Sequence, residues 1–187
     1  MKLGLVAFGL LFGLVLQAAE VPRPAPELTI REATGKKTML SSLKGNVVVL
    51  QFLDTSCPHC QAMAGTLSKI LADWQSRGLR VYGIAFDPSV NTKDPAKNAL
   101  SLSTFASRYA KFPVGSLPRE DVLKYLGISV MQHFYVPQMM VIDRKGVIRA
   151  QDKPLPTGEL NDEAQLRGLL NKLLNEGGAK AGSGGGK

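Results

Sequence analysis

The chain places all of its thiol chemistry in one short loop. Its two cysteines, Cys57 and Cys60, stand in the stretch LQFLDTSCPHCQAM and are separated by Pro58 and His59. Two cysteines at this spacing can form half of a metal site, a structural disulfide or a redox centre. The remaining sequence decides between these three kinds of site.

The metal and structural interpretations are the weaker ones. A structural zinc site usually has four ligands, but the chain has no second cysteine pair, and its two histidines are His59 and His133. Haem attachment needs a histidine directly after the second cysteine, where this chain has Gln61. A disulfide that closes so small a loop constrains the unfolded chain little. A redox centre is therefore the favoured interpretation.

The position of the pair at the start of a helix supports redox chemistry. Apolar residues recur at helical spacing from Met63 to Trp74, and Pro58 fits the first helical position. Cys57 would then lie at or near the N-cap, where free backbone N–H groups and the helix dipole favour the thiolate. Cys60 would lie one turn further on. We therefore expect Cys57 to attack a client disulfide and Cys60 to release the client.

His59 is a candidate tuning residue, because its position between the two cysteines keeps it close to the sulfur. A nearby imidazole, especially a charged one, would stabilise the Cys57 thiolate and make the disulfide more oxidising. The alternative is a solvated histidine at the start of a helix.

Residues 1–19 are predicted to be a secretory signal peptide. Met1 and Lys2 precede an apolar run of 14 residues, and Ala18 and Ala19 supply small residues for cleavage. A membrane span needs about 20 apolar residues. We expect an exported protein of the periplasm or cell envelope, in contact with the membrane only if this segment is retained as an N-terminal anchor. Disulfides can form and persist in such a compartment.

The rest of the chain predicts one α/β domain. A Pro-rich linker is expected at 20–27, the domain at 28–176 and a disordered tail rich in Gly, Ala and Lys at 177–187. Strands and helices alternate, which predicts a sheet that is parallel at its centre and antiparallel at one edge. The expected elements are a hairpin in 28–40, strands at 47–53 and 79–86, helices at 95–110 and 118–127, two strands in 138–151, and a helix at 162–175.

Composition disfavours nucleic acid as a partner. The formal net charge is +8, but the basic residues are scattered and no basic run is interleaved with aromatic residues. A solvated, mildly basic surface explains the charge.

Two stretches resemble the TlpA/ResA-like family of exported thiol–disulfide oxidoreductases. They are PELTIREATGKKTMLSSLKGNVVVLQFLDTSCPHC and YVPQMMVIDRKGVIRA, and the resemblance covers roughly 26–174. It implies a thioredoxin-like fold: a central mixed β-sheet flanked by helices, with an N-terminal β-hairpin and a helical insertion. It also implies client proteins with thiols or disulfides, a membrane redox partner, and no cofactor beyond the protein's own disulfide.

The resemblance assigns roles to two further residues. Pro137 would be a cis-proline packed against the cysteine pair, exposing the backbone of Val136 to an extended substrate segment. The alternative is an ordinary trans proline at a strand start. Asp87 would be a proton relay, acting as a base for Cys60. Its alternative is a loop residue that caps a turn before Pro88.

The chain also departs from the family pattern. Ser56 replaces the usual Trp before the first cysteine, and Gln51 replaces the buried Asp of thioredoxins. The Pro-His dipeptide is that of DsbA-type oxidases, whereas the surrounding residues are those of reductases. The direction of electron transfer therefore stays open.

Two other functions remain open alternatives. A peroxiredoxin-like thiol peroxidase would use the Thr two residues before Cys57, although the upstream Pro of that chemistry is absent. A copper carrier would use the two thiols and His133. His133 is otherwise expected in a loop or partly buried, and Met139 and Met140 are expected in the core rather than at a metal.

Overall fold

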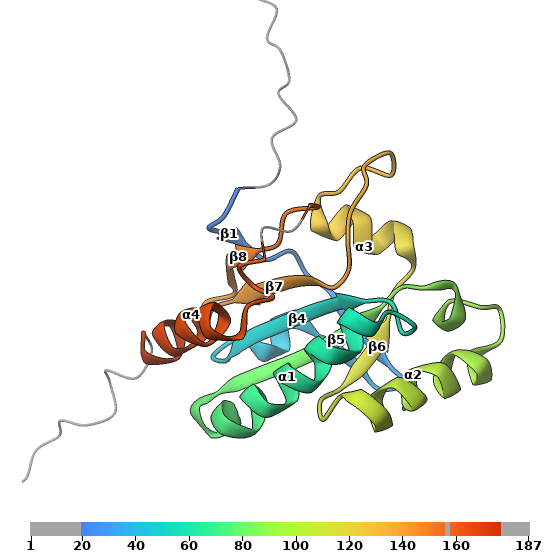
Figure 1. Ribbon diagram of the computed structural model, residues 1–187, viewed down its shortest axis with the longest axis horizontal. Helices are drawn as coiled ribbons and strands as arrows, with labels where there is room; N and C mark the ends of the chain where they lie inside the picture. Colours follow the sequence, from blue (N-terminus) through green and yellow to red (C-terminus); the bar gives the residue numbers. More distant parts are fainter. Residues whose placement is uncertain (1–19, 156–157, 177–187) are drawn as a thin grey trace, which may run out of the picture.

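The computed structural model describes residues 20–155 and 158–176, which form one curled mixed sheet with helices on both faces (Figure 1). The strand order is β1-β8-β7-β4-β5-β6-β2-β3. The strands are β1 (Arg23–Pro24), β2 (Thr29–Glu32), β3 (Lys37–Met39), β4 (Val47–Leu53), β5 (Leu79–Ala85), β6 (Val114–Ser116), β7 (Gln138–Ile142) and β8 (Val147–Gln151). The helices are α1 (Pro58–Trp74), α2 (Pro95–Tyr109), α3 (Arg119–Leu126) and α4 (Glu163–Asn175). The predicted signal peptide and the predicted tail lie outside the described residues.

Strand β4 is the centre of the sheet. All seven of its residues are buried, and it pairs in parallel with β5 and antiparallel with β7. Its last residue, Leu53, is level with Ala85 of β5, and Phe52 is level with Gln138 of β7. The loop after β4 is therefore flanked by the loop after β5 and by the residues that precede β7. This register brings together the cysteine loop, Asp87 and Pro137.

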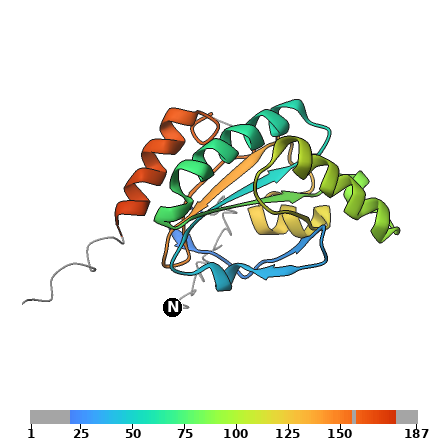
Figure 2. The ribbon, with the colours of Figure 1, turned by 90° about the horizontal axis from the view of Figure 1, so that it is seen from below.

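The helices cover the two faces unequally (Figure 2). Helices α1, α2 and α4 lie on one face, and α3 lies on the other. Odd-numbered residues of β4 such as Val47 and Val49 belong to the core under the first face, and even-numbered ones such as Val48 and Leu50 to the core under the second. Alternation of side chains along a strand explains this division. The fold is the mixed sheet flanked by helices, with an N-terminal hairpin, that the resemblance implies.

The edges of the sheet differ from the sequence prediction in two ways. Antiparallel strands occur at both edges rather than at one, because the hairpin β2–β3 pairs back onto β6. The sequence indicates this hairpin but not the strand to which it attaches. The segment expected as a linker contributes β1, which pairs with β8. A proline is tolerated there because β1 is an edge strand.

One glycine permits the attachment of the hairpin. A Cβ atom on Gly115 of β6 would lie 2.5 Å from the carbonyl oxygen of Arg31 in β2. Glycine therefore allows a close backbone approach that any other residue would prevent.

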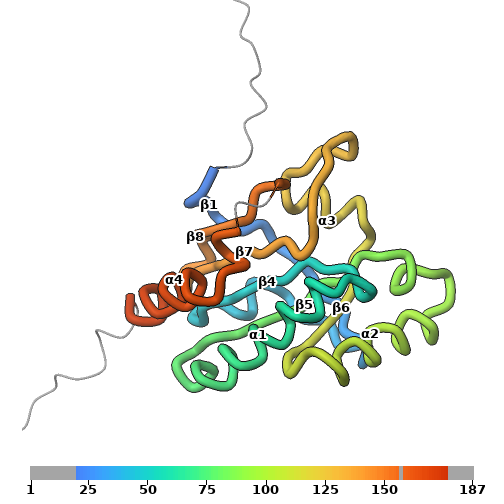
Figure 3. Tube along the Cα trace, in the orientation of Figure 1, coloured from blue at the N-terminus to red at the C-terminus, as the bar shows by residue number. Residues whose placement is uncertain are grey.

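The polypeptide between α3 and β7 forms a long loop that stands out from the body of the domain (Figure 3). This loop ends at Val136 and Pro137, directly beside the cysteine pair. None of the helices described for this chain is both long and apolar enough to span a membrane.

Candidate active site

Cys57 lies at the N-cap of α1, as the sequence predicts. Its backbone is extended, with φ −76° and ψ 118°, and Pro58 takes the first helical position. The Cys57 Sγ accepts a hydrogen bond from the backbone N–H of Cys60 at 3.3 Å. An N-cap residue normally satisfies one of the free N–H groups of the first turn in this way. Negative charge on the sulfur is stabilised by that N–H group and by the helix dipole.

The segment before β7 lies against the same sulfur. The Cys57 Sγ is 3.9 Å from the carbonyl oxygen of Val136, and the Val136–Pro137 peptide bond is cis. The cis bond agrees with the resemblance. The backbone of Val136 and the Cys57 sulfur can therefore contact one bound polypeptide at the same time.

Cys60 has a different environment from Cys57. Cys60 is fully buried, whereas Cys57 is partly exposed, and both are free thiols. Burial raises the pKa of the Cys60 thiol well above its usual range, and its hydrogen bond with Cys57 and the charges of Cys57 and Asp54 act in the same direction. The backbone of Asp54 opposes this rise by hydrogen bonding to the sulfur. The pair thus combines an accessible sulfur with a buried, protonated one.

Gln51 lies beneath the pair, where thioredoxins have an Asp. Its side-chain Nε2 donates to the carbonyl oxygen of Cys60 at 2.9 Å. Its Oε1 is buried and has no hydrogen-bond partner among the described residues. Gln51 therefore supports the first turn of α1 through this hydrogen bond to the backbone. Its amide side chain does not ionise near neutral pH, so it cannot relay a proton.

Asp87 anchors the cysteine loop. Its carboxylate accepts hydrogen bonds from the backbone N–H of Thr55 at 3.0 Å and from the Thr55 hydroxyl at 3.2 Å. It also accepts from the backbone N–H of Ser89 at 3.1 Å and from the Ser89 hydroxyl. Asp87 thereby caps the short 3₁₀ helix Pro88–Val90. These contacts correspond to the turn-capping alternative, and the proton-relay role stays a prediction.

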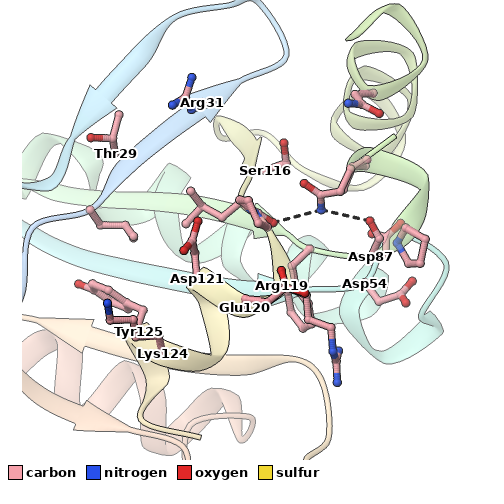
Figure 4. A pocket seen from close by; sticks show the side chains of 18 of the residues that line it. Thr29, Arg31, Asp54, Asp87, Ser116, Arg119, Glu120, Asp121, Lys124 and Tyr125 are labelled. Carbon is pink, nitrogen blue, oxygen red and sulfur yellow. Dashed lines mark hydrogen bonds between the residues drawn. The ribbon is translucent and has the colours of Figure 1, made fainter. Parts of the chain in front are cut away.

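The larger of the two pockets flanking the redox loop lies on the Asp87 side (Figure 4). It measures about 1240 Å³, and neither cysteine lines it. Charged side chains reach it from several segments, and they include Asp54, Asp87 and Arg119. The Arg119 guanidinium lies over the rings of Phe86 and Phe134, 5.8 and 5.0 Å from their centroids. This flank combines charged side chains with apolar ones such as Phe86 and Leu117.

The smaller pocket lies on the other flank and measures about 450 Å³. His59, Val136 and Pro137 line it, together with Tyr135 and residues of α1. We call it the cis-proline pocket. No pattern in the sequence predicts this pocket, because its walls come from α1 and from segments that follow much later in the chain.

The remaining candidate residues are divided between surface and core. His59 and His133 are both exposed, His133 on the loop between α3 and β7. Met139 and Met140 are fully buried in β7, which confirms that they belong to the core. Within 20–155 and 158–176, no three His, Cys, Asp or Glu side chains form a group that could hold a metal ion.

Comparisons with known proteins agree with this geometry. The model of the AhpC/TSA family matches residues 21–151. The thiol-disulfide oxidoreductase ResA of Bacillus anthracis is 24% identical over 155 residues, covering 82% of this chain and 79% of that protein. ResA of Geobacillus thermodenitrificans is 24% identical over 147 residues, covering 78% and 74%.

Solved structures show the same fold. A thiol:disulfide interchange protein of the thioredoxin family from Chlorobium tepidum TLS has a TM-score of 0.62 at 22% identity, covering 84% of this chain and 99% of that one. A thiol:disulfide interchange protein from Bacteroides sp. has a TM-score of 0.62 at 22% identity, covering 88% and 95%. The chain therefore belongs to the AhpC/TSA family and is a thioredoxin-like oxidoreductase related to the ResA proteins.

Proposed function

We propose that this protein exchanges disulfides with client proteins through Cys57 and Cys60. The observation that carries the proposal is the asymmetry of the pair: Cys57 is an accessible N-cap sulfur facing the Val136 carbonyl, and Cys60 is a buried thiol one turn away. Such an arrangement favours one attacking and one resolving thiol.

The reductive direction proceeds in two displacements. The Cys57 thiolate attacks one sulfur of a client disulfide, forming a mixed disulfide and releasing the other client sulfur as a thiolate, which takes a proton from solvent. Cys60 then loses its proton and attacks the Cys57 sulfur. The Cys57–Cys60 disulfide forms, and the second client sulfur leaves. Two electrons have passed to the client, and a membrane redox partner would restore the dithiol. The oxidative direction is the reverse.

Cysteine variants test these roles. Cys57→Ala should abolish formation of a mixed disulfide with an oxidised client peptide. Cys60→Ala should accumulate it, because the resolving thiol is missing, and mass spectrometry would detect the adduct. A Cys60→Ala protein that accumulates no adduct would show that the role assignment is wrong.

The reduction potential of the pair decides the direction of transfer. A value near about −120 mV would identify a donor of disulfides, and a value of about −250 mV or below a donor of electrons to oxidised clients. If His59 stabilises the reduced form, His59→Pro should give a more negative potential. An unchanged potential would leave His59 as a solvated side chain.

Thr55 bears on the peroxidase alternative. Its hydroxyl bonds to Asp87 and Ser89 at 3.2 Å each, so it is engaged away from the cysteine pair. Disulfide exchange is therefore the better-supported chemistry. Direct consumption of hydrogen peroxide at a rate exceeding exchange with client disulfides would reverse this ranking.

Export is part of the proposal and rests on the predicted signal peptide at 1–19. Fractionation of cells that express the full chain should place it in the periplasm or cell envelope. The mass of the recovered protein would distinguish a cleaved from a retained segment. Recovery of the full-length protein in the cytoplasm would contradict export.

A further inference from the structure

The segment that faces the Cys57 sulfur has few contacts of its own. The carbonyl oxygen of Val136 is 3.9 Å from that sulfur, but neither its N–H nor its carbonyl group pairs with another backbone group in the described part of the chain. Val136 also lies outside the sheet, since β7 begins at Gln138. The position of this segment is therefore set by its neighbours along the chain.

Gln138 supplies a direct restraint on the segment. Its side chain is fully buried, and its Nε2 donates to the carbonyl oxygen of Tyr135 at 2.8 Å and to that of Lys153 at 3.2 Å. Its backbone is level with Phe52 of the central strand β4. The side-chain amide therefore ties the residue before Val136 both to the sheet and to the segment that follows β8.

The segment that follows β8 is itself fixed to β7. The N–H of Asp152 donates to the carbonyl oxygen of Met139 at 2.9 Å, and the Asp152 carboxylate accepts from the N–H of Met139 at 2.9 Å. The N–H of Tyr135 donates to the carbonyl oxygen of Pro154 at 3.0 Å. Both backbone polar groups of Tyr135 are thus bonded, one to Pro154 and the other to Gln138. Tyr135 is therefore held on two sides, one residue before the segment that faces the sulfur.

The other end of the Gln138 amide is unfavourable for folding. Its Oε1 is buried and has no hydrogen-bond partner among the described residues. A buried polar atom without a partner lowers stability. An apolar side chain of similar size would avoid that cost, but it would leave the Tyr135 carbonyl without its donor. The contribution of this glutamine is therefore the placement of the Tyr135 carbonyl rather than a fully bonded polar group in the core.

We propose that Gln138 is a positioning residue for disulfide exchange. Its amide holds Tyr135, and through it the Val136 backbone, where an extended polypeptide can pair with that backbone while its sulfur meets Cys57. Because Gln138 is buried, it acts through Tyr135 and does not touch the client. A small disulfide without a peptide backbone gains nothing from this placement. The inference rests on the proposed disulfide exchange and adds a residue that acts on its polypeptide substrates alone.

The test measures Gln138→Met on two substrates. One is the disulfide-linked dimer of an unstructured peptide, and the other is hydroxyethyl disulfide. Methionine is similar in size to glutamine but lacks the two Nε2 donors. The second-order rate constant for reduction of the peptide by the reduced protein should fall about tenfold, and that for hydroxyethyl disulfide should change by less than about twofold. An equal effect on both substrates, or no effect on either, would overturn the proposal.

Gln151→Met is the matched control. Gln151 lies in β8, and its Nε2 donates to the carbonyl oxygen of Leu126 at 2.8 Å. It is thus a second glutamine whose amide fixes a backbone carbonyl, but that carbonyl belongs to α3 and not to the segment beside Cys57. Gln151→Met should keep the wild-type ratio of the two rate constants. A ratio that falls equally in both variants would show that any loosening of the sheet suffices, and would overturn the role of Gln138.

Two further measurements separate positioning from other effects. Gln138→Val, with a side chain suited to a strand, makes the same deletion and keeps the test available if Gln138→Met does not fold. The pH–rate profile for hydroxyethyl disulfide should coincide in the wild type and the variant, because the amide does not bond to the sulfur. A shifted profile would mean that Gln138 acts on the thiol and would overturn the proposal.

The wild-type protein distinguishes failure of this inference from failure of the proposed function. A wild type that reduces neither the peptide nor hydroxyethyl disulfide would contradict disulfide exchange itself. A wild type that reduces both, together with a Gln138→Met protein that reduces the peptide equally fast, would contradict only the positioning role.

Discussion

Two buried aspartates support the two flanks of the redox loop in different ways. Asp87, on the flank with the larger pocket, accepts hydrogen bonds from the N–H and hydroxyl groups of both Thr55 and Ser89. Asp152, beneath the other flank, accepts from the N–H of Met139 at 2.9 Å and from the side-chain amide of Asn161 at 3.2 Å. Burial raises the pKa of Asp152 to about 6. The two carboxylates are equally buried but differ in the number of their donors.

The difference shows that two equally buried carboxylates can have different hydrogen-bond environments. Hydrogen bonds to a carboxylate favour its charged form, and desolvation opposes it. Asp87 connects two loops through four donors, and its position suits an anchor. Asp152 has two donors, and burial dominates its titration. Both residues follow a strand, so their position along the sequence does not separate them.

The largest expected effect comes from removing the Asp87 anchor. Asp87→Ala leaves the N–H groups of Thr55 and Ser89 without an acceptor, which should lower the free energy of unfolding by about 2–4 kcal/mol. Denaturant unfolding measures the loss. The matched control is Asp94→Ala, an exposed cap of α2 whose carboxylate accepts from two N–H groups. It should cost about 1 kcal/mol.

A different result would restore the relay interpretation of Asp87. If Asp87→Ala destabilised the protein no more than Asp94→Ala but slowed resolution of the mixed disulfide at least tenfold, Asp87 would be a base for Cys60 rather than an anchor.

The next largest effect concerns the titration of Asp152. Its folded-state pKa of about 6 exceeds the ordinary aspartate value of 3.8, so between these values the folded state binds more protons than the unfolded state. The contribution of Asp152 to stability is present in full below about pH 4 and is lost as the pH rises through about 6. Asp152→Asn cannot ionise. At pH 7 it should exceed the wild type in free energy of unfolding by about 1–3 kcal/mol.

Unfolding at pH 4.5 and pH 7 checks this sign. The gap between Asp152→Asn and the wild type should be larger at pH 7. Asp162→Asn serves as the control, because Asp162 is an exposed N-cap of α4 and Asn is an equally good cap. Equal gaps at both pH values would show that Asp152 titrates in its ordinary range.

The sequence predicts local features of this molecule better than contacts between distant segments. The sequence predicts Cys57 at the N-cap of α1, and this cap makes the expected hydrogen bond. Asp94 and Asp162 cap α2 and α4 in the same way. The apolar run at 47–53, interrupted only by Gln51, predicts the central strand residue for residue. These predictions succeed because a cap and a buried strand are defined by neighbouring residues.

The sequence does not predict which distant segments come into contact across the sheet. The strand at Arg23–Pro24 has no apolar pattern and exists because β8 offers a free edge. Thr55 meets Asp87, 32 positions later, only because β4 and β5 are in register. The resemblance supplied Pro137, which lies beside Cys57 although 80 positions separate them. Neither the resemblance nor the sequence pattern predicts the other residues that line the cis-proline pocket.

The smallest expected effect tests a residue that the sequence did not single out. Asp54 lies three residues before Cys57, and its charge contributes to the raised pKa of Cys60, after burial and after the contacts with Cys57. Asp54→Asn removes the charge but keeps an oxygen that can accept from Ser56. The pKa of Cys60 should fall slightly, so resolution of a preformed mixed disulfide should accelerate by less than about threefold at fixed pH. The pH–rate profile of that step should shift to lower pH, whereas Asp121→Asn, which removes an acid lining the same large pocket, should leave it in place. A profile that Asp54→Asn does not move would mean that solvent screens this carboxylate from the buried thiol, and that burial and Cys57 alone keep Cys60 protonated.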